Sequence, residues 1–347
     1  MLVGMPEGME GATMEEILRW GLIGCGDVTE VKSGPALQRA VGSQLLRVAS
    51  RRPEQAADWA RRHAVPHWHV DIDELLASPD IDAVYIATRP DSHCELTLRA
   101  AAAGKAVLVE KPMALDPAEC EAMIAACRLA GVPLWVAYYR RALPRFLAIR
   151  ELLEAEAIGA LRAVHWRQLR PLPTPDRQRT AAHRWRVDPA CSGGGLFFEA
   201  ACHALDALDF LLGPLEQVQG LAANQAGAWA PEDIVSATWR HGGEGPGRGV
   251  LGSLLWCQSA GVEEECTEII GSRGRIAWSS VRGGSVQITR DGRSDELQIP
   301  DPPHVHQPLV QTIVGEWFGR GCCPSRGESA LQTARVMERL LAAPGRT

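Results

Sequence analysis

Residues 20–26 read Trp20-Gly-Leu-Ile-Gly24-Cys-Gly26, a short apolar strand that ends in two glycines separated by one residue. In the fingerprint G-x-G-x-x-G/A, the first glycine makes a tight turn and the second lets backbone amides approach a pyrophosphate. Thr29 stands at the third position of that pattern. Because the stretch precedes an expected helix, it predicts a dinucleotide turn. A glycine turn without a ligand is the alternative interpretation.

The chain after this turn alternates between strands and helices as far as residue 138. Apolar runs predict further strands over 45–50, 83–88, 106–110 and 134–137. The segments between them predict helices over 53–63, 71–77, 91–103 and 117–130. This alternation is typical of βαβ units and a parallel sheet. Asp27 and Val28 would open the first helix, whose N-terminus favours phosphate.

The second half of the chain has a different rhythm. We expect a helix over 143–156, a strand over 161–169 and a polar, arginine-rich loop over 170–188. A second helix is expected over 196–212, a run of strands with glycine-rich turns over 216–298, and two final helices over 307–319 and 328–342. Successive strands without crossover helices indicate an antiparallel sheet.

These patterns predict an α/β protein with two domains. The first is a Rossmann domain with a doubly wound parallel sheet, and the second is an α+β domain with a large open antiparallel sheet. The expected divisions are an extension over 1–18, the nucleotide domain over 19–138, the α+β domain over 139–325 and a C-terminal helix over 326–347. The first 18 residues contain four methionines, which indicates a mobile extension or sequence ahead of a start near Met14.

Length and composition exclude several classes of protein. The chain has 347 residues, and domains usually have roughly 100–200. Its net charge of −6 gives no electrostatic basis for binding nucleic acid or acidic membranes. It has no apolar run long enough for a membrane helix, and its acidic start is unlike a signal peptide. Ten scattered cysteines without a CxxC pair indicate reduced thiols and a cytoplasmic location.

The end of the second strand bears on the choice of nucleotide. An NAD site places an acid about 20 residues past the glycines, where it accepts the ribose hydroxyls. Here the strand ends in Ser50-Arg51-Arg52, without an acid. A hydroxyl and two guanidiniums suit a 2′-phosphate, so the sequence favours NADP, with NAD possible. The alternative is that both arginines are ordinary solvated surface charges.

Glu110-Lys111-Pro112 follows an apolar strand, at the edge where open α/β sheets bind ligands. Only three of the 36 basic residues are lysine, so a lysine at this edge is unusual. Unlike arginine, lysine releases a proton in proteins, and its pKa falls when it is desolvated. Lys111 is therefore a candidate to polarise a carbonyl or hold an alcohol oxygen. The alternative is a surface lysine paired with Glu110.

A glycine run at 193–195 precedes a helix that carries Glu199, His203 and Asp206. These side chains share one helix face, and a carboxylate beside an imidazole can fix its tautomer and raise its basicity. We therefore expect His203 to transfer a proton with help from Glu199. A core histidine is the main alternative, and a metal site has little support because no partner motif is present.

Two further groups of residues carry less information. Trp185 and Arg186, in the arginine-rich loop, could reach across a cleft to cofactor or substrate, or simply pack within the loop. The pairs His67/His69 and His304/His306 could be ligand pairs, but polar edge residues are the favoured interpretation.

Four motifs in order resemble the Gfo/Idh/MocA oxidoreductases. They are the GCG turn, Ala-Thr-Arg-Pro-Asp-Ser-His over 87–93, Glu-Lys-Pro over 110–112, and the GGG…E-x-x-x-H-x-x-D segment over 193–206. The resemblance covers the chain from about Arg19. It implies NAD(P)-dependent hydride transfer at a carbinol carbon of a sugar, polyol or related molecule. It also implies a homodimer or homotetramer through the C-terminal sheet, and a final helix that returns to the first domain.

By the same resemblance, Lys111 would bind the reacting oxygen and His203 would be the acid/base. Glu199 falls where many members have aspartate, and it keeps the carboxylate on a longer side chain. Thr88, His93 and Arg140 would line cofactor or substrate. A non-catalytic NAD(P)-binding regulator or sensor is the alternative function, and a recycled, tightly held cofactor is a third.

Overall fold

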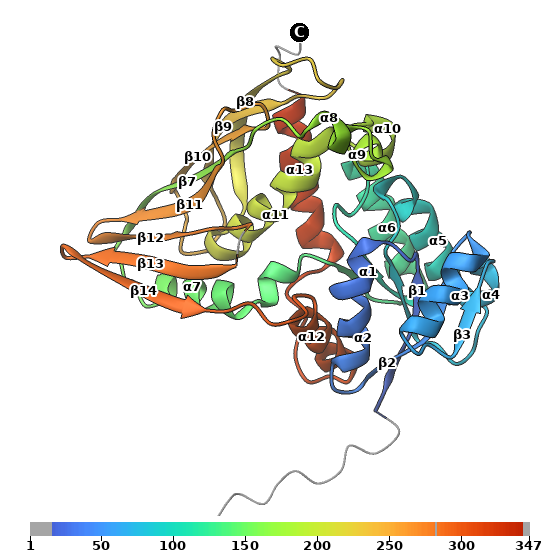
Figure 1. The fold of residues 1–347 in the computed structure, drawn as a ribbon. Helices are drawn as coiled ribbons and strands as arrows, with labels where there is room; N and C mark the ends of the chain where they lie inside the picture. Colours follow the sequence, from blue (N-terminus) through green and yellow to red (C-terminus); the bar gives the residue numbers. More distant parts are fainter. Residues whose placement is uncertain (1–15, 282, 343–347) are drawn as a thin grey trace, which may run out of the picture.

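The computed structural model describes residues 16–281 and 283–342, which form two β-sheets with helices packed on and between them (Figure 1). The expected extension over 1–18 and the start near Met14 lie outside the described residues, apart from Glu16, Ile17 and Leu18. Of these, Leu18 already begins the first strand.

The first sheet has six parallel strands in the order β3-β2-β1-β4-β5-β6. Its strands are β1 Leu18–Ile23, β2 Ser43–Ala49, β3 His67–His69, β4 Ala83–Ile86, β5 Ala106–Val109 and β6 Leu134–Val136. All four residues of β4 and of β5 are buried, as continuous apolar strands covered on both faces should be. The predicted doubly wound Rossmann sheet is confirmed.

Helices cover both faces of this sheet. They are α1 Asp27–Val31, α2 Gly34–Arg39, α3 Pro53–Arg62, α4 Ile72–Leu76, η1 Pro90–Ser92, α5 His93–Ala102 and α6 Pro117–Ala130. One apolar core contains Leu37 of α2 and Trp59 of α3, and the other contains Leu96 of α5 and Met123 of α6. Since β1, β4 and β5 are neighbouring parallel strands, their C-terminal ends lie side by side at one edge of the sheet.

The second sheet has eight strands in the order β14-β13-β12-β11-β7-β10-β9-β8. They are β7 Leu161–Leu169, β8 Leu215–Ala223, β9 Ile234–His241, β10 Leu251–Cys257, β11 Glu264–Gly271, β12 Gly274–Trp278, β13 Gly284–Arg290 and β14 Arg293–Ile299. The prediction of an antiparallel sheet needs one correction, because β10 runs parallel to β7. The first strand of this domain is inserted between later ones, so the sheet is mixed.

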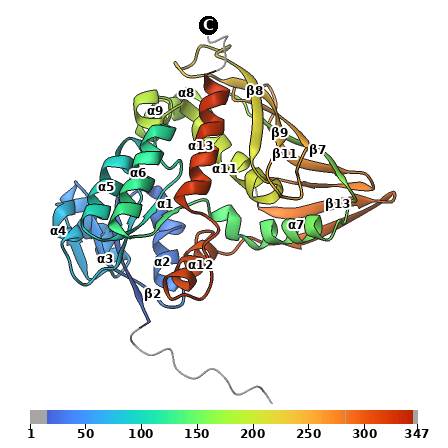
Figure 2. The ribbon, with the colours of Figure 1, turned by 180° about the vertical axis from the view of Figure 1, so that it is seen from behind.

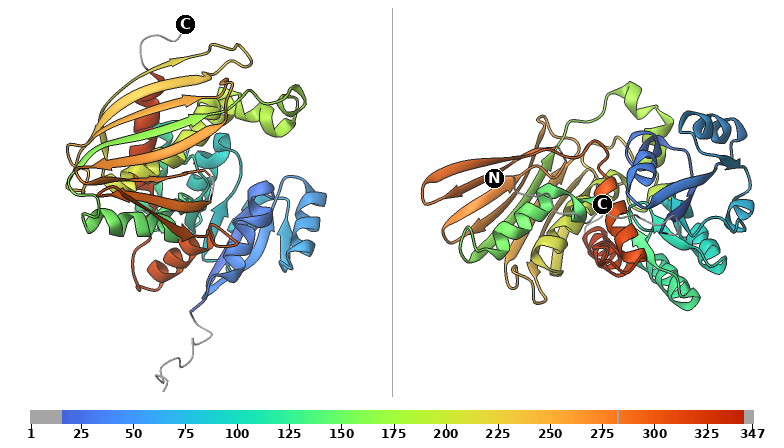
Figure 3. Two further views of the ribbon diagram at one scale, coloured as in Figure 1. Left: turned by 60° about the vertical axis from the view of Figure 1, so that its left-hand side comes forward. Right: turned by 90° about the horizontal axis from the view of Figure 1, so that it is seen from below.

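Helices cover only one face of the second sheet (Figure 3). Phe146 of α7 (Pro144–Glu154) and Leu205 of α11 (Gly195–Leu212) pack there against the inward-facing Trp166 and Trp256. Alternate residues such as Arg167 and Leu251 point to the other face and are exposed. The sheet therefore has one open face, as predicted.

The C-terminal helices join the two halves. Helix α13 (Gly327–Leu341) lies between α6 and α11 (Figure 2), and an ion pair of 2.8 Å links Arg335 to Glu121 of α6. Helix α12 (Gln307–Trp317) packs its apolar residues, including Ile313, into a core of the first sheet. The predicted division at residue 325 had placed α12 with the second domain.

The arginine-rich segment 170–188, predicted as a loop, contains two short helices, and a third follows it directly. These are α8 Pro175–Gln178, α9 Ala181–Arg186 and α10 Pro189–Ser192. Thr174, Thr180 and Asp188 cap them, each accepting a hydrogen bond from a backbone N–H of the helix it precedes. Within the described residues, no helix has the length and apolar character needed to cross a membrane.

Candidate active site

The glycine turn lies at the C-terminal edge of β1, between β2 and β4. Gly24 has a φ of +104°, and a Cβ there would lie 2.9 Å from the Ala87 carbonyl oxygen. Only glycine fits this position without strain. Gly26 borders open space. Thr29, at the third motif position, is buried and donates from Oγ1 to the Gly26 carbonyl at 2.7 Å, so the hydroxyl closes the turn.

The start of α1 is suited to bind phosphate. Gly26 is the N-cap residue and has no side chain to cap the first amides, so those of Asp27 and Val28 have no side-chain partner within residues 16–281 and 283–342. Gln55 braces the turn from α3, donating from Nε2 to the Cys25 carbonyl at 2.6 Å. An open glycine surface beside uncapped amides fits a pyrophosphate.

Ser50, Arg51 and Arg52 follow β2 at the same edge of the sheet. Ser50 Oγ lies 3.4 Å from the Gln55 side chain. Both arginines are exposed, and within residues 16–281 and 283–342 neither guanidinium has an ion-pair partner. Nearby Arg47 and Arg62, by contrast, pair with Asp80 and Glu30.

Glu110 is a buried carboxylate at the end of β5. One oxygen accepts hydrogen bonds from the Tyr85 hydroxyl and from His306 Nε2 (3.2 Å), and the other accepts from the Lys111 backbone N–H at 3.0 Å. Burial acts to raise the pKa of Glu110, but His306, Lys111 and Tyr85 outweigh it and lower the pKa to about 2. Glu110 is therefore ionised at neutral pH.

The Lys111 ammonium lies among groups that keep it charged. Burial acts to lower the pKa of Lys111, but the Cys202 thiol and the carboxylates of Glu199 and Glu110 act in the opposite direction, and the net pKa is raised. The lowering of the pKa by desolvation, which would let Lys111 release a proton near neutral pH, is therefore outweighed here. Lys111 is a protonated hydrogen-bond donor at neutral pH.

His203 projects from α11 toward the same place. Its ring lies 5.6 Å from the Tyr139 ring. Its Nδ1 is buried and has no hydrogen-bond partner among the described residues, which leaves Nε2 as the nitrogen that a ligand can reach. Burial lowers the pKa of His203 well below its ordinary value, assisted by the charges of Arg140 and Lys111. At neutral pH the imidazole is neutral and able to accept a proton.

The expected carboxylate support for His203 is absent from the described structure. Glu199 instead binds Arg186, whose Nε lies 2.8 Å from Glu199 Oε2. Asp206 is fully buried and pairs with Arg141 at 2.9 Å. Glu199, His203 and Asp206 do share one face of α11, but each carboxylate pairs with an arginine and not with the His203 imidazole.

The remaining predicted site residues are Thr88, Trp185, Arg140 and His93. Thr88 follows β4 beside the glycine turn, and Trp185 stacks under Arg186, whose guanidinium is 4.5 Å from the ring centroid. Arg140 is 7% exposed and donates to the Ser280 carbonyl. His93 is fully buried, with its ring nitrogens 3.0 and 3.2 Å from the carbonyl oxygens of Pro112 and Thr88. It braces two loops, so the expectation that it lines the cofactor needs correction.

Three residues near the site were not predicted from the sequence. Tyr85 and His306 bind Glu110, and Tyr139 lies between the rings of His203 and His306. His304 is partly exposed and bonded to Arg39, as expected for an edge histidine, whereas His306 is 2% exposed. Burial of His306 depends on the path of the chain after β14, which local sequence does not specify.

Comparison with known proteins identifies the family. Residues 18–138 match the "Oxidoreductase family, NAD-binding Rossmann fold" and residues 146–277 match the "GFO/IDH/MocA C-terminal domain". The chain therefore belongs to the Gfo/Idh/MocA family of NAD-binding oxidoreductases, as the motifs had indicated.

Named relatives of the chain are oxidoreductases. It is 32% identical to an oxidoreductase of Formosa agariphila over 325 residues, covering 94% of this chain and 98% of the relative. It is 27% identical to the 1,5-anhydro-D-fructose reductase of Ensifer adhaerens, covering 90% and 92% of the two chains.

Solved structures share the fold. The aldose-aldose oxidoreductase of Caulobacter crescentus, complexed with glycerol, superposes with a TM-score of 0.81 at 24% identity, covering 93% and 96% of the two chains. Structures with this fold have been determined with NAD+, NADH or NADP.

Proposed function

We propose that the protein transfers a hydride between NADP and a carbinol or carbonyl carbon of a sugar, polyol or related small molecule. The observation that carries the proposal is the pairing of a protonated Lys111 with a neutral His203 beside the C-terminal edge of the first sheet. A nucleotide-binding regulator would need the glycine turn but neither of these groups.

The two side chains have complementary roles in this proposal. Lys111 donates a hydrogen bond to the substrate oxygen and stabilises negative charge that develops there. His203 accepts the hydroxyl proton at Nε2 during oxidation and returns it during reduction. When bound, the nicotinamide supplies the hydride acceptor or donor.

Neighbouring groups keep both side chains in these states. Glu110, ionised and held by three donors, favours the charged form of Lys111. Arg140 and Lys111 both oppose protonation of His203. A proton taken by His203 is consequently held weakly and is readily passed on to solvent or back to product.

The glycine turn and the two unpaired arginines support the choice of NADP. The uncapped amides of Asp27 and Val28 would hold the pyrophosphate. Arg51 and Arg52, exposed and without acidic partners among the described residues, would hold the 2′-phosphate beside Ser50.

Absorbance at 340 nm tests the proposal. Aldoses, inositols, polyols and their keto forms are incubated with NADP(H) and with NAD(H) separately. Substrate-dependent turnover that prefers NADP is the expected result. Failure of NADP and NAD to quench tryptophan fluorescence would contradict the proposal at its first step, because the site would not bind a nucleotide.

We also propose that the open face of the second sheet pairs with another copy of the chain. Leu221, Leu251 and Leu255 are exposed large apolar residues on strands of this sheet. Light scattering on wild-type protein and on Leu251→Glu tests this, with a smaller assembly expected for the variant. The ten free thiols fit a reducing, cytoplasmic location within the same proposal.

A further inference from the structure

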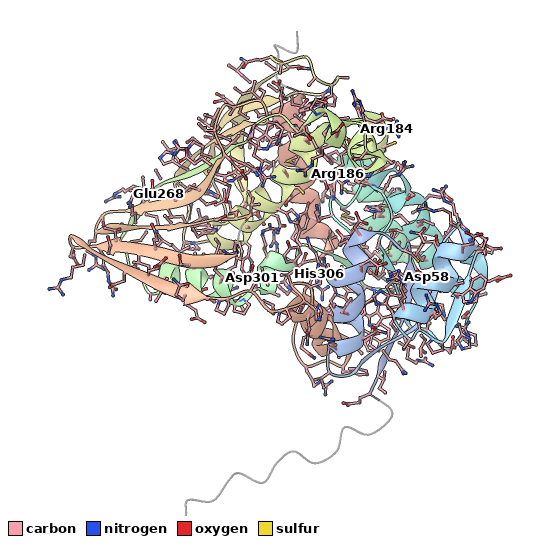
Figure 4. All side chains as sticks on the ribbon, viewed as in Figure 1. Asp58, Arg184, Arg186, Glu268, Asp301 and His306 are labelled. Atoms are coloured by element: carbon pink, nitrogen blue, oxygen red, sulfur yellow. The ribbon has the colours of Figure 1, made fainter. Side chains whose placement is uncertain are left out.

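His306 lies between the two sheets, near the centre of the molecule (Figure 4). It is the N-cap residue of α12 and is 2% exposed. Its Nε2 lies 3.2 Å from Glu110 Oε1, and its ring centroid lies 4.6 Å from that of Tyr139. Its Nδ1 is buried, and no residue in the described part of the chain forms a hydrogen bond with it. Nε2 and the ring face therefore make its specific contacts.

The contact between His306 and Glu110 connects His306 to Lys111. Glu110 Oε1 receives the His306 and Tyr85 donors, while Oε2 receives the Lys111 backbone N–H. A buried carboxylate needs its donors, because unpaired charge in a protein interior is costly. Without His306, Tyr85 alone would remain on Oε1, and the carboxylate that holds the Lys111 backbone would shift.

The contact between the His306 and Tyr139 rings connects His306 to His203. The Tyr139 ring lies between two imidazoles, 4.6 Å from His306 and 5.6 Å from His203. The Arg140 guanidinium also lies over the Tyr139 ring, 5.0 Å from the ring centroid. Removing the His306 ring would leave Tyr139 free to move toward the vacated space, away from His203.

We propose that His306 is a positioning residue that fixes Lys111 relative to His203, holding Glu110 through Nε2 and Tyr139 through its ring. The inference rests on the proposed function for its catalytic consequence. His306 acts through its two neighbours, so nucleotide affinity should not depend on it.

Two matched variants separate positioning from general packing. In His306→Gln the amide nitrogen reaches the place of Nε2 and keeps the donor to Glu110. In His306→Asn the amide nitrogen reaches only the place of Nδ1, where no partner exists. Both changes remove the ring and retain a polar amide, so a purely structural role would affect them alike.

The turnover measurement has a clear expectation. For His306→Asn we expect kcat to fall by about 10- to 100-fold, because small displacements of reacting groups have effects of that order. KM for NADP should stay near the wild-type value. His306→Gln should lose less kcat than His306→Asn, because it keeps the donor to Glu110 and lacks only the ring contact with Tyr139. Equal losses in both variants, or a loss confined to KM for NADP, would overturn the proposal.

A second measurement needs no substrate. The chain has only three lysines, Lys32, Lys105 and Lys111, so trace acetylation with acetic anhydride followed by peptide mass spectrometry reports each one separately. The reaction requires the unprotonated amine, and it therefore senses the Glu110 charge beside Lys111. The ratio of Lys111 to Lys105 labelling should rise several-fold in His306→Asn and return in His306→Gln.

The two measurements keep the proposed function and this inference apart. If the wild-type protein turns over no substrate, the proposed function fails, and the labelling ratio still decides whether His306 positions Lys111. A ratio that changes in the Asn variant alone supports the inference. An unchanged ratio in both variants overturns it, whatever the turnover.

Discussion

Replacing Arg51 and Arg52 together by alanine should weaken NADP binding and leave NAD binding nearly unchanged. Both guanidiniums are exposed at the end of β2 and have no acidic partner among the described residues. A 2′-phosphate would therefore meet two arginines that need not break another ion pair first. NAD has no phosphate at this position, so it should not sense the change.

The magnitude follows from the exposure of the two side chains. Hydrogen bonds to charged groups contribute about 1.5–3 kcal/mol when sheltered, but exposed ion pairs usually contribute only about 0.2–1 kcal/mol each. Both arginines are solvated, so the lower range applies, with a sum of about 0.4–2 kcal/mol. At 1.4 kcal/mol per tenfold change, NADP affinity should fall by about 2- to 30-fold.

Tryptophan-fluorescence titrations with NADP and NAD, at low and high salt, provide the assay. The wild-type preference for NADP should shrink at high salt, because surface charges are screened. Arg61→Ala is the control, since it removes one exposed arginine charge, against two in the double variant, from a side chain already paired with Asp58. An equal loss of affinity for both nucleotides in the double variant would refute the reasoning.

Further predictions concern the reactive pair and the core beneath it. His203→Ala should lower kcat by about 10²- to 10⁴-fold without changing NADP affinity in a fluorescence titration. Since burial lowers the pKa of His203, the acid limb of a kcat/KM profile for alcohol oxidation should have its midpoint below pH 6.5; a midpoint above pH 7 would exclude His203 as the base. Arg141→Met should lower the free energy of unfolding in urea by about 3–5 kcal/mol, because it leaves the buried Asp206 carboxylate unpaired. A loss below about 1 kcal/mol, the range of surface pairs, would contradict that account.

The first sheet could be predicted because its signals are local. The apolar run of β4 and the helix boundaries of α6 follow from composition, from the Asp116 N-cap and from Gly131, which has a φ of +68°. The order of strands in the second sheet was less accessible. The parallel pairing of β7 with β10 joins segments about 90 residues apart, which no periodic pattern specifies.

The candidate site, like the fold, could be predicted from the sequence only where the signal is local. Residue types at sheet edges identified Lys111 and His203, and the helical spacing correctly placed Glu199 and Asp206 on one face. That spacing did not show which arginine would form an ion pair with each carboxylate. Arg186 arrives from α9 and Arg141 from η2 (Tyr139–Ala142), and both contacts depend on how distant segments meet.

The pKa of Lys111 illustrates the limit of single-residue reasoning. Desolvation alone does act to lower this pKa, as it does for any buried lysine. The outcome depends on the acidic groups that share the space, which come from α11 and from Glu110 itself. His306, treated as an edge residue in sequence, is part of the same buried arrangement.

The central claim is hydride transfer to or from NADP that depends on Lys111. Initial rates at 340 nm, measured with the best substrate of the panel for wild-type protein, Lys111→Ala and Lys105→Ala, test it most directly. Lys105 donates to the carbonyls of Ser78 and Ile81, away from the proposed site, and serves as the control. The account predicts that Lys111→Ala loses turnover while still binding NADP, and that Lys105→Ala retains it. Turnover of Lys111→Ala equal to that of the wild type would contradict the account.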